Sequence, residues 1–134
     1  MSEAVEAIEA VEAFRQRARA FIQANLRPSS PSDSVGVLRP RRSDEEELAA
    51  VARERELQRM LFDAGFAGIC FPPEYGGQGL TPAHQHALNE EMAGYEFPGR
   101  MQVPTMSPCA AVLLEFGTEA QKQDHLPAIL RGEE

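Results

Sequence analysis

Helical periodicity is the feature that most constrains how this chain folds. Apolar residues recur at three- and four-residue steps through the first stretch, which predicts one stripe of an amphipathic helix from about Glu3 to Asn25. The stripe consists of Val5, Ile8, Val11, Phe14, Ala18, Phe21 and Ile22. Similar patterns follow downstream, and we therefore predict an all-α fold, a helical bundle of about five helices.

Capping residues mark the second and third helices. Ser43 followed by Glu46 is a capping box, in which each side chain reaches the other's backbone N–H, and Gly65 can take the left-handed conformation that closes the helix. Thr81 and Pro82 form the N-cap and first position of a third helix, predicted to run to about Tyr95. Its inward side chains are predicted to be Ala87, Leu88 and Met92.

Two further helices are predicted near the C-terminus. Ser107 and Pro108 repeat the cap-then-proline pattern before residues 109–116, a helix so apolar that it is either buried or faces another domain. Thr118 and Gln121 form a second capping box, which opens a last helix towards Leu130. Pro127 predicts a kink or a restart within that helix.

Two connecting segments separate the first three helices. Residues 26–42 break the periodicity with three prolines and predict a mobile connector. Its basic residues Arg39, Arg41 and Arg42 either attract a phosphate or balance the acidic residues 44–47. Residues 66–71 are too apolar for a surface loop and are expected to pass through the core.

Length and charge restrict the classes of partner. The 134 residues suit a single domain spanning 1–134, and a net charge of -8 repels phosphate backbones and anionic lipid. No apolar run approaches the ~20 residues that cross a bilayer. We therefore expect no nucleic acid and no membrane partner, and, since no targeting signal is visible, a cytoplasmic location. Cys70 and Cys109 fit no zinc spacing and are predicted to be buried, reduced thiols.

Several residue groups are of types that occur in functional sites, but their spacing does not support such a role. The glycine cluster at 76–79 lacks the third glycine of a dinucleotide fingerprint and the Lys-Ser or Lys-Thr of a Walker loop, which favours a structural turn. His84 and His86, two apart on a helix, point to different faces and cannot share a metal ion. Glu90 and Glu91 are predicted to face solvent or to form salt bridges rather than to act as bases.

Four segments resemble the acyl-CoA dehydrogenase family in residue type and order. Residues 61–80 (LFDAGFAGICFPPEYGGQGL) are similar to that family's segment with the pattern aGf.gi..PeeyGG.G. Residues 89–93 (NEEMA), 116–122 (FGTEAQK) and 126–133 (LPAILRGE) resemble its EE+a helix, its fGteeqK turn and its LP.ll.Ge segment. The resemblance covers about residues 49–134, and it implies the family's all-helical amino-terminal domain.

The resemblance also implies a function in fatty acid or lipid metabolism. Family members are oxidoreductases that oxidise an acyl-CoA thioester at its α,β carbons with FAD. A carboxylate removes the α proton while hydride leaves the β carbon for the flavin. In the family those groups lie in a middle strand domain and a carboxyl-terminal helical domain, which we expect to be absent here. We therefore carry over no catalytic or flavin-binding residue, and expect the chain alone to be inactive and without bound FAD.

What the family assigns to this domain is one wall of the acyl pocket, around residues 100–114. The candidate pocket-lining residues are Met101, Val103, Met106 and Cys109, whose soft side chains adapt to a ligand or, alternatively, pack only in the domain's own core. The expected partners are acyl-CoA and the remaining dehydrogenase domains or a partner subunit, with homo-oligomers at full length. Related oxidases and monooxygenases share the domain. The alternative function is a stand-alone helical protein-interaction module that kept the family fold.

Overall fold

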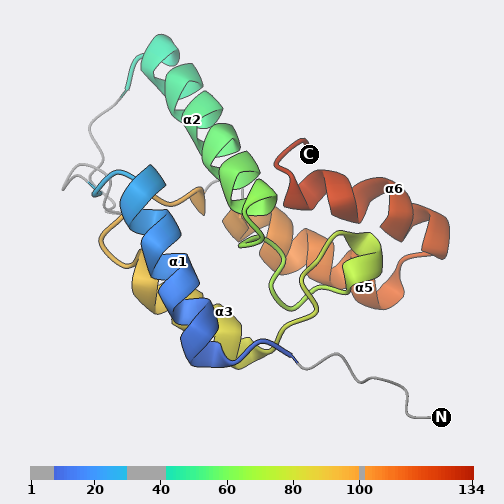
Figure 1. Ribbon diagram of the computed structural model, residues 1–134. Helices are drawn as coiled ribbons and strands as arrows, with labels where there is room; N and C mark the ends of the chain where they lie inside the picture. The colour runs from blue at the N-terminus through green and yellow to red at the C-terminus, as the bar shows by residue number, and fades with distance from the viewer. Residues whose placement is uncertain (1–7, 30–41, 100–101) are drawn as a thin grey trace.

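Helices make up the regular structure of the part of the chain that the computed structural model describes, residues 8–29, 42–99 and 102–134 (Figure 1). Within these ranges lie five α-helices and no strand, apart from one isolated bridge between Pro28 and Tyr95, which confirms the all-α prediction. None of the helices in these ranges is both long and apolar enough to cross a membrane. The α-helices are α1 (Val11–Asn25), α2 (Asp44–Asp63), α3 (Pro82–Met92), α5 (Ala111–Phe116) and α6 (Glu119–Leu130).

Helix α1 starts later than its apolar periodicity predicts. The prediction of a start at about Glu3 is wrong for residues 8–10, which precede the helix, while residues 3–7 lie outside the described ranges. Ala10 is extended, with φ −63° and ψ 140°. The carbonyl of Glu9 accepts a hydrogen bond from Nε2 of His84 at 2.6 Å. This carbonyl therefore bonds to α3 and does not extend α1 by a further turn.

Helices α1 and α3 pack side by side (Figure 1). Ion pairs join the two helices. Arg15 contacts Glu90 at 2.6 Å and Glu91 at 3.3 Å, and Arg19 contacts Glu91 at 2.8 Å. These contacts confirm that the two glutamates form salt bridges. Below them, Ala87, Leu88 and Met92 are buried as predicted.

Helix α2 has the predicted boundaries because both ends satisfy their own backbone groups. At its start, the Ser43 hydroxyl accepts from the Glu46 N–H at 3.2 Å, while the Glu46 carboxylate accepts from the Ser43 N–H at 2.8 Å. At its end, Gly65 has φ +83°, and the Phe66 N–H donates to the Leu61 carbonyl at 2.7 Å. This is the glycine-terminated arrangement that satisfies the last carbonyls of a helix.

The segment between α2 and α3 crosses the molecule and hydrogen bonds to itself. Phe66, Ala67 and Ile69 are buried, which confirms the predicted passage through the core. A short 3₁₀ turn, η2 (Pro73–Tyr75), reverses the chain. The returning N–H groups of Gln78, Gly79 and Leu80 then donate to carbonyls of the outgoing residues 68–71 at 2.8–3.0 Å. The outgoing and returning halves therefore form one closed unit.

Two hydrophobic clusters lie on either side of this crossing segment. The larger one joins α1, α2 and α3 around Phe14, Ile22, Leu61 and Phe66. The smaller one joins Tyr75 of η2 to Ala110, Leu126 and Ile129. The crossing segment contributes to both clusters, so it connects the two halves of the domain.

Three other predicted segments differ from the structure or lie partly outside the described ranges. Helix α3 ends at Met92, before the predicted Tyr95, because Gly94 at φ +85° turns the chain and Tyr95 pairs with Pro28. Helix α6 runs through Pro127 as one element, so the predicted restart is wrong. Residues 26–29 of the predicted connector lie against residues 94–96, and residues 30–41, with Arg39 and Arg41, lie outside the described ranges.

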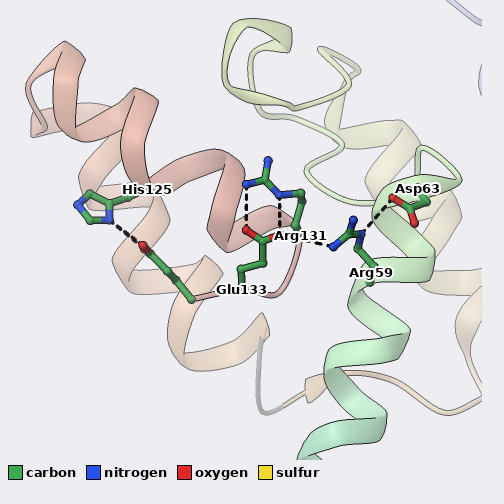
Figure 2. A network of polar contacts seen from close by, with 6 residues as sticks. Arg59, Asp63, His125, Arg131 and Glu133 are labelled. Carbon is green, nitrogen blue, oxygen red and sulfur yellow. Dashed lines mark hydrogen bonds and ion pairs between the residues drawn. The ribbon is translucent and has the colours of Figure 1, made fainter.

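A polar network ties the end of the chain to α2 (Figure 2). Glu133 accepts from Arg131 at 3.0 Å and from Arg59 of α2 at 3.4 Å, and Arg59 also reaches Asp63 at 3.4 Å. His125 contacts the neighbouring Glu134 carboxylate at 2.9 Å. These contacts are exposed, and such pairs contribute little each, so they orient the last turn more than they stabilise it.

Gly77 is the residue of the crossing segment with the least room. A Cβ there would overlap the carbonyl oxygen of Phe71, which is backbone and cannot rotate away. We expect Gly77→Ala to destabilise the fold by roughly 2–4 kcal/mol, measured by urea unfolding followed by circular dichroism. The matched control is Gly99→Ala, whose new Cβ would meet only Phe97 at 3.5 Å and should change stability by less than about 0.5 kcal/mol. Equal effects of the two substitutions would contradict this packing.

The α1–α3 ion pairs predict a specific pH dependence. The hydrogen bond from Arg19 holds the pKa of Glu91 below its ordinary value, against the opposing effect of burial and with help from Arg15. Since the folded pKa is the lower one, the stabilisation is complete above about pH 5, where the unfolded carboxyl is also ionised, and is lost as the pH falls through the folded pKa.

Glu91→Gln should therefore reduce the loss of stability between pH 6 and pH 3, measured by urea unfolding at each pH. The control is Glu115→Gln at an exposed position on α5. An unchanged pH profile in Glu91→Gln would show that these ion pairs do not stabilise the folded state.

Candidate functional site

The predicted pocket wall is built on an unusual helix. Residues Gln102–Ala110 form a π-helix, η3, which runs directly into α5. The predicted helix start at Ser107 is therefore wrong, because the helical backbone already exists before it and Pro108 lies inside the helix. A serine followed by proline is common at the first turn of a helix, but here Pro108 lies inside the π-helix. π-helical turns are rare and occur preferentially at functional sites.

The structure separates the four predicted pocket residues. Val103 is 65% exposed, and Cys109 is exposed as well. Met106 is half-buried and packs against the smaller cluster, next to Ala110 and Leu126. Met101 lies outside the described residues. Val103 and Cys109 therefore have exposed side chains, whereas Met106 packs against the domain's own core, and their role as pocket residues stays a prediction.

Both cysteines differ from the prediction of buried thiols, since Cys70 and Cys109 have exposed side chains. Cys70 follows the buried Ile69, and Cys109 precedes the buried Ala110. At both positions the local backbone directs the cysteine side chain outwards. Partial burial still raises the pKa of the Cys70 thiol. A raised pKa leaves less of the thiolate that reacts at neutral pH.

A small recess opens between α3 and η3. Its volume is about 30 Å³, and its lining combines apolar side chains with amides. The apolar part includes Leu88, Met92 and Met106, and the polar part Gln85, Asn89 and Gln102. A space of this size holds a water molecule or the end of a ligand, not a complete acyl chain.

Helix α5 presents apolar side chains outwards. Val112 is 57% exposed and Phe116 is 78% exposed, and no residue of α5 is fully buried. Leu113 and Leu114, half-buried, face the smaller cluster. Of the two predicted environments, burial within this chain is therefore wrong, and contact with another domain stays a prediction.

The glycine cluster does not offer its backbone to a phosphate. The N–H groups of residues 76–80 all donate to carbonyls of residues 68–73, at 2.8–3.1 Å. Anion-binding loops instead direct several unpaired N–H groups at the ligand. The prediction of a structural turn is confirmed, and this loop does not fit the pyrophosphate of a dinucleotide.

The histidines also lie as predicted, on different faces of α3. His84 is buried, and its Nδ1 lies 2.7 Å from the Thr81 hydroxyl while its Nε2 faces the Glu9 carbonyl. His86 is exposed beside Glu90 at 3.0 Å. Throughout the described residues, no three His, Cys, Asp or Glu side chains gather as a metal site would require.

Tyr75 is a polar connection that the sequence did not single out. Its hydroxyl donates to the Glu119 carboxylate at 2.7 Å, which joins η2 to the first turn of α6. The bond to Glu119, followed by burial, raises the pKa of Tyr75 to about 12. The phenol therefore stays protonated at neutral pH and holds the turn against α6.

Sequence reasoning also missed Gln58 and Gln102. Gln58 is 0% exposed; its Nε2 donates to the Leu130 carbonyl at 2.8 Å, and its Oε1 accepts from Gln102 Nε2 at 2.7 Å. The available signal was its position: residue 58 lies one turn before Leu61, on the buried side of α2. A glutamine on a charged helix is normally assigned to solvent, so the pattern alone does not reveal it.

The different burial of Met106 and Val103 predicts different costs of truncation. Met106→Ala removes half-buried contacts with α6 and should destabilise the fold by about 1–2 kcal/mol. Val103→Ala removes exposed atoms and should change stability by less than about 0.5 kcal/mol. Urea unfolding followed by circular dichroism measures both values, and a larger cost for Val103→Ala would contradict the orientation of η3.

Comparisons with known proteins identify the family. Residues 9–133 match the family model described as acyl-CoA dehydrogenase, N-terminal domain. The chain is 29% identical over 119 residues to acyl-CoA dehydrogenase IpdE1 of Mycobacterium tuberculosis, covering 89% of this chain and 30% of that protein. It is 38% identical over 80 residues to (2S)-methylsuccinyl-CoA dehydrogenase of Cereibacter sphaeroides, covering 58% of this chain and 14% of that one.

A solved structure agrees with these matches. The steroid ACAD Tcur3481-Tcur3483 is 31% identical, with a TM-score of 0.56 over 98% of this chain and 31% of that chain. The chain thus spans about 30% of the length of IpdE1 and of this structure. The family model matches nearly the whole chain, and the helical fold agrees with it. The chain therefore belongs to the acyl-CoA dehydrogenase family, in which it corresponds to the N-terminal domain.

Proposed function

We propose that this domain works in a flavin-dependent acyl-CoA dehydrogenase, which introduces an α,β double bond into an acyl-CoA thioester, and that η3 forms one wall of the acyl pocket. The observation that carries the proposal is the family match over residues 9–133, within which η3 and α5 expose Val103, Val112 and Phe116. The relatives named above share CoA thioesters as the class of compound in their names, and we extend the proposal to that class.

The chemistry of η3 suits an acyl chain. Met101, Val103, Met106 and Cys109 are the candidate lining residues, and thioether, thiol and small aliphatic side chains adapt to an apolar ligand without requiring hydrogen bonds. Val103 and Cys109 are the exposed pair. The recess beside Met106, with its amide groups, would receive at most the end of a ligand.

We place the flavin and the catalytic base outside the described part of this domain. The glycine loop does not fit a flavin pyrophosphate, because its N–H groups are bonded internally. Glu90 and Glu91 are poor bases, since hydrogen bonds from Arg15 and Arg19 lower their pKa. What this domain would supply is shape: a fixed apolar wall that excludes water from the thioester.

The exposed apolar residues of α5 support a contact with other polypeptide of the enzyme. Val112 and Phe116 would be covered by the remaining dehydrogenase domains or by a partner subunit in a homo-oligomer. The same observation favours the second candidate function, a stand-alone interaction module that docks through α5. The two differ in their ligand, since only the dehydrogenase binds acyl-CoA. The cytoplasmic location of this protein stays a prediction.

The test of the pocket wall is a charge placed on η3 in the flavin-loaded enzyme. Val103→Arg should raise the KM for acyl-CoA about tenfold or more with flavin content unchanged, because a cation would be buried against the acyl chain. Glu45→Arg, at the exposed start of α2, is the matched control and should leave the KM unchanged. An unaltered KM in Val103→Arg would place the acyl pocket elsewhere.

Titration of this chain alone with FAD and with acyl-CoA provides the complementary test. We expect no stoichiometric flavin absorbance and negligible heat, because the groups that bind the flavin lie on other polypeptide. A stoichiometric yellow complex would overturn that division. Binding of a partner protein through Phe116, with no acyl-CoA binding by the assembled protein, would favour the interaction module.

A further inference from the structure

The buried glutamine of α2 stands out among the polar groups that the pocket proposal leaves unused. Gln58 is 0% exposed, and a buried amide is costly unless its donor and acceptor are both bonded. Here both are: the Nε2 donates to the Leu130 carbonyl at the end of α6, and the Oε1 accepts from Gln102 at the start of η3. One side chain therefore connects α2, α6 and η3.

Helix η3 needs such a connection more than an α-helix would. Pro104 and Pro108 have no backbone N–H, so two of the nine residues of η3 cannot donate a backbone hydrogen bond and contribute only their carbonyls as acceptors. π-helical turns are also intrinsically rare, which indicates that tertiary contacts decide where they form. Near its two ends, η3 is held by the Gln102 amide and by the packing of Met106 and Ala110 against α6.

The position of Gln58 is itself tightly determined. A Cβ added at Gly132 would lie 3.0 Å from both Cβ and Cγ of Gln58, so the stem of the glutamine packs against the glycine that follows α6. Gly132 has φ +77°, a conformation that favours glycine. The stem of Gln58 is therefore packed in place, and its amide is held by the bonds to Leu130 and Gln102.

We propose that Gln58 is a positioning residue that fixes the start of η3 and thereby the shape of the acyl-facing wall. Gln58 touches no expected ligand and acts through Gln102, which lines the recess between α3 and η3. Its connection to the acyl pocket rests on the proposed function. Its effect on η3 does not, and the two can be tested separately.

The first test is hydrogen exchange in the complete chain, read on peptides covering residues 102–110 and 119–130. Gln102→Met removes only the bond to Gln58 and should accelerate exchange about fivefold in 102–110, leaving 119–130 unchanged. Gln58→Met also frees the Leu130 carbonyl and should accelerate both segments. The double variant should match Gln58→Met in 102–110, because the effect of Gln102 passes through Gln58.

The control is Gln16→Met, which removes an exposed glutamine bonded to Glu12 on α1. Exchange in 102–110 that is the same in Gln102→Met as in Gln16→Met would overturn the proposal. Because Gln102→Met keeps the bond between Gln58 and Leu130, it decides the question even if Gln58→Met does not fold.

The second test is kinetic and uses the flavin-loaded enzyme. Gln102→Met should raise the KM for acyl-CoA several-fold with kcat within about twofold and flavin content unchanged, a split that general destabilisation would not produce. A wild-type enzyme that does not bind acyl-CoA would refute the proposed function, and the exchange data would still decide on Gln58. Faster exchange with an unchanged KM would refute the effect on the acyl wall.

Discussion

The hydrogen bonds that close the crossing segment upon itself are the constraint on which the rest of this domain depends. Residues 66–80 leave α2, pass between two hydrophobic clusters and return, and the returning N–H groups bond to the outgoing carbonyls. Burying a backbone in this way is possible only because those groups are paired. Gly77 permits the close approach that the pairing requires.

The closed segment also explains why the glycine cluster is structural. Each N–H that a phosphate would need is already donated to the protein, so the glycines serve the return of the chain and not a ligand. Arg15 and Arg19 of α1 are likewise paired with Glu90 and Glu91 of α3. Helices η3 and α5, in contrast, expose the apolar side chains Val103, Val112 and Phe116.

Local signals in the sequence predicted the elements that local interactions determine. The capping box at Ser43 and the glycine at 65 set both ends of α2, and the box at Thr118 sets the start of α6, because each motif satisfies backbone groups within a few residues. The family's segment patterns also favour an acyl wall on residues 100–114, which stays a prediction. These features needed no knowledge of distant contacts.

Two of the corrections have a different cause, which is competition from distant partners. Helix α1 starts late because His84 takes the Glu9 carbonyl, and η3 forms where a first turn was expected because contacts with α2 and α6 support it. Gln58 escaped prediction because its partners lie 44 and 72 residues away in sequence. The periodicity of one sequence gives no information on contacts between residues far apart in the chain. The details of the candidate site therefore could not be predicted from it.

Amide exchange resolved by NMR at Gln78, Gly79 and Leu80 tests most directly whether the crossing segment organises the fold. If these three N–H groups are bonded across the segment in the core, they should exchange as slowly as the amides in the middle of α2, although they lie in a stretch without regular secondary structure. Exchange at the rate of a solvated loop would contradict the account, because the two clusters would then be joined by something other than this backbone.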